Sequence, residues 1–226
     1  MQDPAAGDMP QGDMPQAVLE GRRVRLRAVA PADYDWLFQL NSLPELAHRW
    51  RGRPGSLNPS QMAEFLWNNV FCQFVICRRR DGRPLGLVVA YGADLPNRTV
   101  RFGIVLDPQF HSVGWPLEAA ALFIDYLFDT GDFRKVYSEA VDYNLQAYQS
   151  ALDNGIVRME GCLKEHVYSA GKYRDYYMFA IYRDDWVGKR SAGRVPLGQA
   201  AQALPGYPER ATEVANMENS VFRMDT

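Results

Sequence analysis

Apolar and polar positions follow two different periods along the middle of the chain. Helical spacing is clearest in Gly114–Phe128, where apolar side chains recur at i, i+3, i+4 and i+7 and mark one buried face. Shorter apolar or alternating runs, bounded by turn residues, predict strands. The predicted strands are Arg23–Val29, Cys72–Arg78, Pro84–Tyr91, Thr99–Leu106, Lys135–Val141, Ile156–Lys164 and Tyr173–Tyr182. The other predicted helices are Pro31–Leu40, Pro59–Asn69 and Asn144–Asp153.

The order of these elements predicts the fold class. Asp81-Gly82 lies between two predicted strands and is a strong signal for a tight hairpin. The helix Gly114–Phe128 instead connects two strands as a crossover, so part of the sheet must be parallel and covered on both faces. We therefore expect an α/β protein with a mixed central sheet of about six to seven strands and helices on both faces.

Composition indicates one folded domain with two tails. The 226 residues, 47% of them hydrophobic, can bury one substantial core. Residues 1–18 carry the sequence GDMPQ twice, at Gly7–Gln11 and Gly12–Gln16, and hold little to bury, which predicts a disordered N-terminal arm. Residues 187–226 are rich in Gly, Pro and Ala and are expected to form an extended tail. The expected domain spans residues 19–186.

The charge pattern argues against two classes of partner. A net charge of −2 with mixed signs favours neither a nucleic acid nor a membrane surface. Arg23, Arg25 and Arg27 alternate along a predicted strand, and we interpret them as a solvated strand face. No apolar run approaches the ~20 residues that a membrane span needs. The N-terminal residues also lack the basic and apolar regions of a secretory signal.

Cysteine and histidine usage predicts a reduced compartment and no metal. The three cysteines, Cys72, Cys77 and Cys162, cannot all pair, and the chain has no C-x-x-C motif and no Cys/His cluster. Because only three histidines are available, a zinc site is not expected. A cytoplasmic location fits these features best.

Two segments indicate a cofactor that carries a pyrophosphate. Gly114, Trp115 and Pro116 open the long helix directly after an apolar strand and a turn. A helix N-terminus presents unpaired N–H groups and the positive end of its dipole, so it can hold a phosphate. The second segment, Asn144–Gly161, is a short helix stopped by Asn154-Gly155 and followed by a strand.

These segments and the element order resemble the GCN5-related N-acetyltransferase (GNAT) superfamily, in particular its ribosomal-protein-alanine acetyltransferase branch. The resemblance covers Leu19 to Trp186. The family's phosphate loop, Gln/Arg-x-x-Gly-x-Gly/Ala, corresponds to His111–Pro116, with the fourth-position glycine present and the first and sixth positions changed. Its later pattern is matched by Asn144, Ala147, Gly155-Ile156 and Glu160-Gly161, and its closing hairpin by Gly171, Asp175 and Trp186.

The resemblance implies acetyl-CoA as co-substrate and no metal. In the family two neighbouring strands splay apart, which here are Thr99–Leu106 and Lys135–Val141, and the pantetheine arm lies between them. The implied backbone contacts to the arm are Ile104, Val105 and Leu106, and those to the diphosphate are His111, Ser112, Val113, Gly114 and Trp115. Pro116 has no N–H to offer a phosphate. Asn144 would bond the arm, although the sequence supports a helix N-cap equally well.

The resemblance also implies a general base and leaves the general acid open. Glu139 would deprotonate the amine, with a surface strand charge as the alternative interpretation and Asp142 as a weaker candidate. The family places a hydroxyl at positions that are Ala147 and Ala151 here. Tyr148 is the candidate replacement on the same helix; otherwise water assists the thiolate, or acetyl transfer has been lost.

The acceptor is less well defined. In the family the two early helices form one wall of the acceptor pocket, which implicates Tyr34, Trp36, Trp50 and Trp67, although most of these should be core aromatics. We expect direct transfer of an acetyl group to a primary amine, either of a small molecule or of a protein N-terminus. The alternatives are a non-catalytic acyl-CoA-binding or interaction protein and transfer of a larger acyl group. A homodimer is left open.

Overall fold

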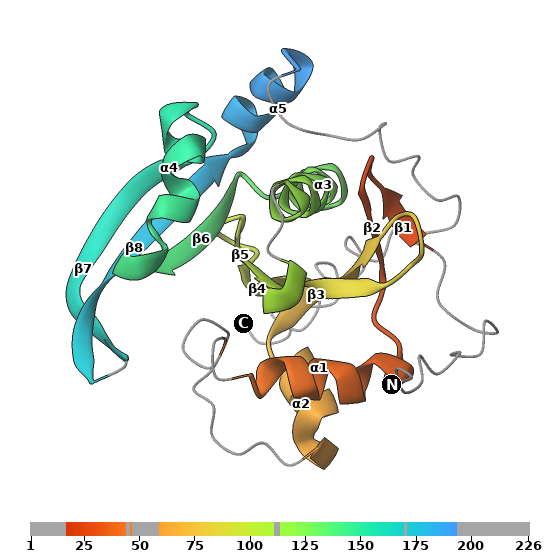
Figure 1. The fold of residues 1–226 in the computed structure, drawn as a ribbon. Helices are drawn as coiled ribbons and strands as arrows, with labels where there is room; N and C mark the ends of the chain where they lie inside the picture. The colour runs from red at the N-terminus through yellow and green to blue at the C-terminus, as the bar shows by residue number, and fades with distance from the viewer. Residues whose placement is uncertain (1–16, 44–45, 47–58, 111–113, 170, 194–226) are drawn as a thin grey trace, which may run out of the picture.

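The structure is a computed structural model that describes residues 17–43, 46, 59–110, 114–169 and 171–193. Most of the predicted N-terminal arm, the predicted tail beyond residue 193 and the side chains of His111 and Trp50 lie outside these ranges. The described residues form one sheet with helices on both of its faces (Figure 1).

The sheet has eight strands in the order β1-β2-β3-β4-β5-β6-β8-β7. Their bounds are β1 Ala17–Glu20, β2 Val24–Ala28, β3 Val70–Arg78, β4 Pro84–Asp94, β5 Thr99–Leu106, β6 Lys135–Val141, β7 Arg158–Ser169 and β8 Lys172–Tyr182. Every neighbouring pair is antiparallel except β5 and β6, which are parallel. The predicted mixed α/β fold is confirmed. The additional strand is β1, which is only four residues long and therefore gives a weak alternation signal.

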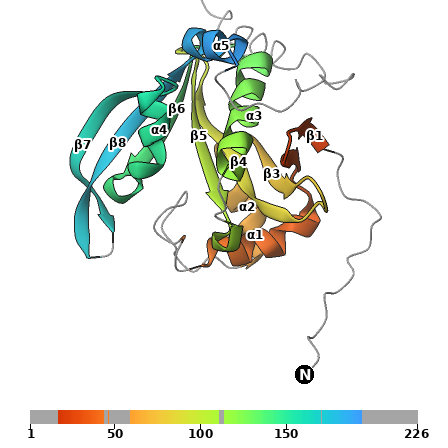
Figure 2. The ribbon, with the colours of Figure 1, turned by 45° about the horizontal axis from the view of Figure 1, so that its top comes forward.

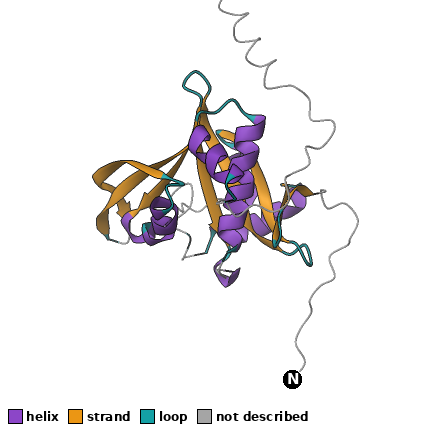
Figure 3. Cartoon of the chain, turned by 90° about the horizontal axis from the view of Figure 1, so that it is seen from above, coloured by secondary structure: helices purple, strands orange, loops and turns teal. Residues whose placement is uncertain are grey.

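Helices cover the two faces of the sheet unequally. Their bounds are η1 Pro31–Asp33, α1 Tyr34–Asn41, η2 Pro59–Gln61, α2 Met62–Trp67, η3 Pro108–Phe110, α3 Trp115–Thr130, η4 Asp142–Asn144, α4 Gln146–Asp153 and α5 Arg183–Ser191. α1 and α2 lie on one face and α3 on the other, while α4 lies beside the β7–β8 hairpin (Figures 2 and 3).

A separate hydrophobic cluster lies on each face of the sheet. The larger one packs the buried face of α3, including Phe123, against strand residues such as Phe74 and Val136. The second packs α1 and α2 against residues that include Val75 and Val105. Because successive strand residues point to opposite faces, one strand contributes to both clusters. The alternation also assigns each site residue described below to a face.

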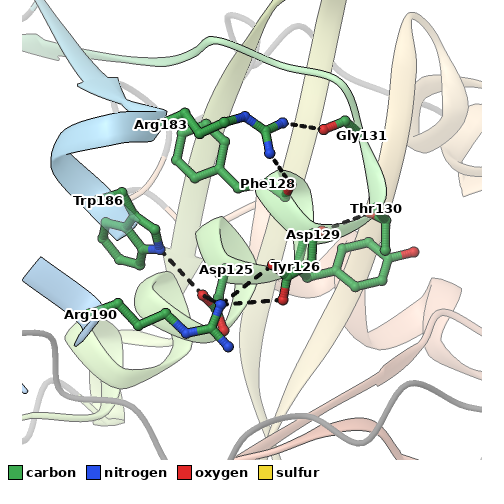
Figure 4. A network of polar contacts seen from close by, with 9 residues as sticks. All are labelled: Asp125, Tyr126, Phe128, Asp129, Thr130, Gly131, Arg183, Trp186 and Arg190. Carbon is green, nitrogen blue, oxygen red and sulfur yellow. Dashed lines mark hydrogen bonds and ion pairs between the residues drawn. The ribbon is translucent and has the colours of Figure 1, made fainter. Parts of the chain in front are cut away.

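α5 corrects the expectation of an extended tail from residue 187. The helix continues to Ser191, and Trp186, at its centre, is 2% exposed. The Trp186 indole N–H donates to Asp125 at 3.3 Å, and the Arg190 guanidinium pairs with the same carboxylate at 2.7 Å (Figure 4). These contacts attach α5 to α3. The low hydrophobicity of the sequence around Trp186 concealed this, because α5 is anchored by ion pairs and one indole.

The interpretation of Arg23, Arg25 and Arg27 as a solvated face is wrong for Arg27. Its side chain is 2% exposed and forms a bidentate pair with Asp33, at 2.7 and 2.6 Å. Asp33 also accepts the N–H of Ala30 at 2.8 Å. The helical turn after β2 supplies this carboxylate, which neutralises an arginine that the sheet pattern points inward.

Three general features bear on function. Within the described ranges, no helix is both long enough and apolar enough to cross a membrane. The same residues contain no group of three or more His, Cys, Asp and Glu side chains that could hold a metal ion. Cys72, Cys77 and Cys162 are free thiols. Burial raises the pKa of Cys72 to about 12, so this thiol stays protonated near neutral pH.

Candidate active site

The parallel strands β5 and β6 pair over only half of their length. Their register runs from Thr99 opposite Lys135 to Phe102 opposite Ser138. Beyond this point β5 pairs only with β4, and β6 only with β8. The expected splay is therefore present, and Figure 2 shows the two strands running apart. Among the described residues, Ile104, Val105 and Leu106 have no strand partner on the edge that faces β6.

Glu139, the first residue of β6 past the splay point, is held by three partners. Its carboxylate accepts the Arg101 Nε–H at 3.1 Å, the Tyr176 hydroxyl at 2.9 Å and the Tyr91 hydroxyl at 3.3 Å. The side chain is 15% exposed, so it is not a simple surface charge. Burial and the nearby Glu139 charge raise the pKa of Tyr176, which keeps that hydroxyl protonated as a donor.

Tyr148 lies at the splay point on the opposite face. Its hydroxyl is 2.5 Å from the Ser138 Oγ, and Ser138 is the last residue of β6 that pairs with β5. The Tyr148 ring stacks on Phe179 of β8, with the ring centroids 4.4 Å apart. Burial raises the pKa of Tyr148, so the hydroxyl carries its proton at neutral pH. Ala147 on the same helix is exposed.

The side chains of Ser138 and Glu139 point to opposite faces of the sheet, because the two residues are consecutive in a strand. Ser138 has the parity of Val136 and Ala140, which belong to the cluster beneath α3. Glu139 therefore points toward the face that carries α1 and α2. The splay point thus has a neutral hydroxyl pair on one face and a carboxylate on the other.

Asn144 and Asp142 lie at the end of β6, in η4. The N-cap of α4 is Leu145, and this cap makes no side-chain hydrogen bond, so the N-cap interpretation of Asn144 is wrong. Asp142 pairs with Arg174 at 3.4 Å and accepts the N–H of Tyr143 at 2.7 Å. Its carboxylate is thus committed to neighbouring groups.

The N-terminus of α3 is built around Gly114. This residue is the N-cap and has φ 103°, in the left-handed region that favours glycine. A Cβ at this position would lie 2.8 Å from the Arg23 Nη1, so the guanidinium of Arg23 lies against the turn. Trp115 is half-buried, and its ring is 6.4 Å from that of Phe110. His111, Ser112 and Val113 lie outside the described residues.

The aromatic residues of the first two helices are partly brought together. The indole N–H of Trp67 donates to the Tyr34 hydroxyl at 3.2 Å, and the Trp67 side chain is 46% exposed. Tyr34 and Trp36 pack against the cluster beneath α1 and α2. Trp50 lies outside the described part of the chain.

Sequence reasoning missed the groups that surround the two candidate catalytic residues. Ser138, Tyr91, Arg101 and Tyr176 come from three other strands and from β6 itself, and no local motif connects them. The one available signal was strand parity, which would have separated Ser138 from Glu139.

A family model for the acetyltransferase (GNAT) domain matches residues 23–156, which is more than half of the chain. The chain belongs to the GNAT acetyltransferases. The matched range includes β5, β6 and the N-terminus of α3, so it covers both strands of the splay. The expectation of this superfamily is confirmed.

Individual relatives are distant. An uncharacterized N-acetyltransferase, YnaD, from Bacillus subtilis is 24% identical over 114 residues, which cover 50% of this chain and 66% of that protein. The chain thus spans slightly less than two thirds of that relative. A spermidine N-acetyltransferase from Vibrio cholerae, solved with CoA and spermine, has a TM-score of 0.66 at 21% identity over 73% of this chain and 98% of its own. A GNAT acetyltransferase from Bacillus anthracis has a TM-score of 0.61 at 18% identity, and the match covers 74% of this chain and 98% of its own.

Proposed function

We propose that this protein is an acetyl-CoA-dependent N-acetyltransferase that acts on a primary amine by direct transfer in a ternary complex. The observation that carries the proposal is the splay of β5 and β6, with Tyr148 on one face of the splay point and Glu139 on the other. Acetyl-CoA, when bound, supplies an activated acyl group whose carbonyl carbon accepts the nitrogen lone pair.

The chain's own residues fit this co-substrate. The free backbone edge of Ile104, Val105 and Leu106 offers hydrogen bonds to an amide-containing pantetheine arm. Asn144 follows the end of β6 that does not pair with β5, in η4, and its side chain does not cap α4. The turn at Gly114 and the start of α3 would hold the diphosphate.

Glu139 would serve as the base. An ammonium group has a pKa near 10 and must lose one proton before its nitrogen can attack, and a second proton leaves the nitrogen as the amide forms. Glu139 accepts protons on the face of α1 and α2, directly or through water. Arg101, Tyr91 and Tyr176 fix the orientation of its carboxylate. The aromatic pair Tyr34 and Trp67 would line the acceptor's approach.

Tyr148 would serve as the acid. As the carbon–sulfur bond breaks, the departing thiolate takes up one proton and leaves as a thiol. The Tyr148 hydroxyl is protonated at neutral pH and lies at the splay point, where its hydrogen bond with Ser138 fixes its orientation. After the thiol has left, a proton from solvent water restores the hydroxyl. This arrangement replaces the hydroxyls absent at Ala147 and Ala151.

Two acceptor classes should be tested first. The fold is shared with spermidine acetyltransferases, which favours a small-molecule polyamine or related amine. The resemblance to the ribosomal-protein-alanine branch adds protein N-termini as the second class. The competing function is an acyl-CoA-binding protein without turnover, which is motivated by the changed residues His111, Pro116, Ala147 and Ala151.

The test is release of free thiol from acetyl-CoA by the full chain, with spermidine, simple primary amines and short peptides as acceptors. We expect turnover with at least one amine class. Glu139→Gln should lower kcat about a hundredfold while CoA binding is retained. Glu165→Gln, at an exposed position of β7, is the matched control and should leave both unchanged. Binding of CoA without turnover in any arm favours the competing function.

A further inference from the structure

An arginine-lined pocket lies beside the N-terminus of α3, away from the splay. It is open, has a volume of about 680 Å³ and is lined by Arg22, Arg23, Arg78, Arg79, Arg80 and Trp115. Its walls come from the β1–β2 turn, the β3–β4 hairpin and the first turn of α3. We call it the arginine pocket.

The β1–β2 turn is fixed to α3 by one buried carboxylate. Glu118, 6% exposed, accepts the backbone N–H of Arg22 and, at 3.0 Å, that of Arg23. Gly21 permits this approach, because a Cβ there would lie 2.4 Å from the Glu118 Oε1 and 2.8 Å from the Val24 carbonyl oxygen. The side chains of Arg22 and Arg23 are exposed. The turn therefore holds two guanidinium groups beside the helix N-terminus.

The β3–β4 hairpin is fixed to the same turn. The N–H of Arg79 donates to the Arg23 carbonyl at 2.8 Å, and the Arg79 Nη1 donates to the Gly21 carbonyl at 2.8 Å. Within the hairpin, Asp81 accepts the Arg78 Nε–H at 2.9 Å. The three segments that line the pocket are thus joined by direct hydrogen bonds, and the pocket has a defined shape.

The charge of the pocket is strongly positive. Among the described residues, Glu20 lies 3.6 Å from the Arg79 Nε, and Asp81 contacts Arg78 and Arg80. Glu118 lies beneath the turn and is already bonded to two backbone N–H groups. Within the part of the chain that the structure describes, the five guanidinium groups of the lining outnumber these three carboxylates, although the whole chain is slightly acidic at −2. Such a local excess favours a multiply charged anion.

We propose that the arginine pocket binds the adenosine 3′-phosphate end of CoA. This rests on the proposed function and extends it to the nucleotide. Guanidinium groups bind phosphate through paired N–H donors, and the Trp115 ring offers a face on which a purine can stack. Arg23 also lies against Gly114, next to Pro116, which cannot donate an N–H to the diphosphate. Side-chain cations from two hairpins thus compensate for a weaker main-chain loop.

The test compares two ligands that differ by one phosphate group. Calorimetric titration of the full chain with CoA and with dephospho-CoA should give a Kd at least tenfold higher for dephospho-CoA. In the Arg22→Gln/Arg23→Gln double variant the CoA affinity should fall and this difference should shrink to below threefold. Arg98→Gln is the control, because Arg98 pairs with Asp132 near the start of β5, at the other end of that strand. It should leave both affinities unchanged.

A second variant guards against misfolding. Arg80 has a side chain that is 74% exposed, so Arg80→Gln should keep the thermal midpoint and still reduce the preference for CoA over dephospho-CoA. Equal affinities in the wild-type chain, or a preference that survives both variants, would overturn the proposal. So would binding of adenosine 3′,5′-bisphosphate alongside saturating CoA, which would indicate a separate nucleotide site. Because the readout is binding, loss of turnover alone bears on the proposed function and not on the pocket.

Discussion

The hydroxyl of Tyr148 lies 2.5 Å from the Oγ of Ser138, at the last paired residue of β6. This contact connects α4 to the point where β5 and β6 part. The ring behind the hydroxyl is fixed by stacking on Phe179. Position and rigidity together are what the proposed role of Tyr148 as the proton donor requires.

Tyr148→Phe should lower kcat for acetyl transfer about a hundredfold, because it removes the proton donor and keeps the stacked ring. The KM for acetyl-CoA should change little. Burial raises the pKa of Tyr148 above its ordinary 10, so the loss in kcat should be the same at every pH from 6 to 9. Steady-state kinetics over this range measure kcat and KM.

Ser138→Ala is the companion variant. It removes the hydrogen bond to Tyr148 without touching the ring, so a smaller loss of about tenfold is expected. If Tyr148→Phe turns over at the wild-type rate across the whole pH range, the thiolate leaves without this hydroxyl.

Glu160 makes stability depend on pH through its contacts with Lys135 and Tyr182. The Lys135 ammonium donates to Glu160 at 2.7 Å, and the Tyr182 hydroxyl donates to the same carboxylate. Partial burial opposes ionisation, but these bonds outweigh it and lower the pKa of Glu160 below its ordinary 4.5. A lowered folded-state pKa stabilises the protein above pH 4.5, and this stabilisation is lost as the pH falls through the folded-state pKa.

Glu160→Gln should therefore reduce the free energy of unfolding at pH 7 and make little difference near pH 3. Urea unfolding at both pH values measures this, with Glu165→Gln as an exposed carboxylate control. If Glu160→Gln lowers the free energy of unfolding by the same amount at pH 7 and at pH 3, the charge of this carboxylate contributes nothing to stability.

Arg183 should be the most sensitive position at the junction of α5 and α3. Its guanidinium donates to three carbonyl oxygens, those of Phe133 at 2.6 Å, Phe128 and Gly131. Figure 4 shows the bonds to Phe128 and Gly131. A lysine keeps the charge but cannot match three carbonyls from one planar fork. Arg183→Lys should lower the free energy of unfolding by about 2 kcal/mol, measured by chemical denaturation. Lys172→Arg, at an exposed position of β8, should leave the free energy of unfolding unchanged. Equal losses in the two variants would show that the three hydrogen bonds of Arg183 contribute nothing to stability.

Gln73 carries a buried amide at a cost to stability. It is 4% exposed, and neither its Oε1 nor its Nε2 has a hydrogen-bond partner among the described residues. Strand parity places it on the face of Val75, beneath α1 and α2. Gln73→Met should raise the free energy of unfolding by about 1 kcal/mol, because it removes an unpaired polar group and keeps the side-chain length. Gln149→Met on exposed α4 should give no gain, and destabilisation by Gln73→Met would mean that the amide is hydrogen-bonded.

The elements with a strong local signal were predictable from the sequence. Strands Thr99–Leu106 and Lys135–Val141 have the predicted bounds, and Asp81-Gly82 forms the predicted hairpin, because periodicity and turn chemistry are properties of neighbouring residues. β1 and α5 were missed. The first is too short for a clear period, and the second depends on Trp186 reaching Asp125, which lies 61 positions away in sequence.

In the candidate site too, some residues were predictable from local motifs and others were not. A resemblance to known motifs indicated Glu139 and Asn144, whereas the partners that hold Glu139 required the register of four strands. The arginine side chains near Gly114 could be read from the sequence only as a charged strand face. Their convergence depends on Glu118 and Gly21, which bring two turns against a helix.

The opposed directions of Ser138 and Glu139 have a consequence for how such a site can change. Under the proposed function, the residues around the amine and the residues around the thiol lie on separate sides of one sheet, so mutations on either side can accumulate independently. A single inserted or deleted residue within β6 would instead exchange the two sides at once. New acceptors should therefore arise by substitution around α1 and α2, while the length of this strand stays fixed.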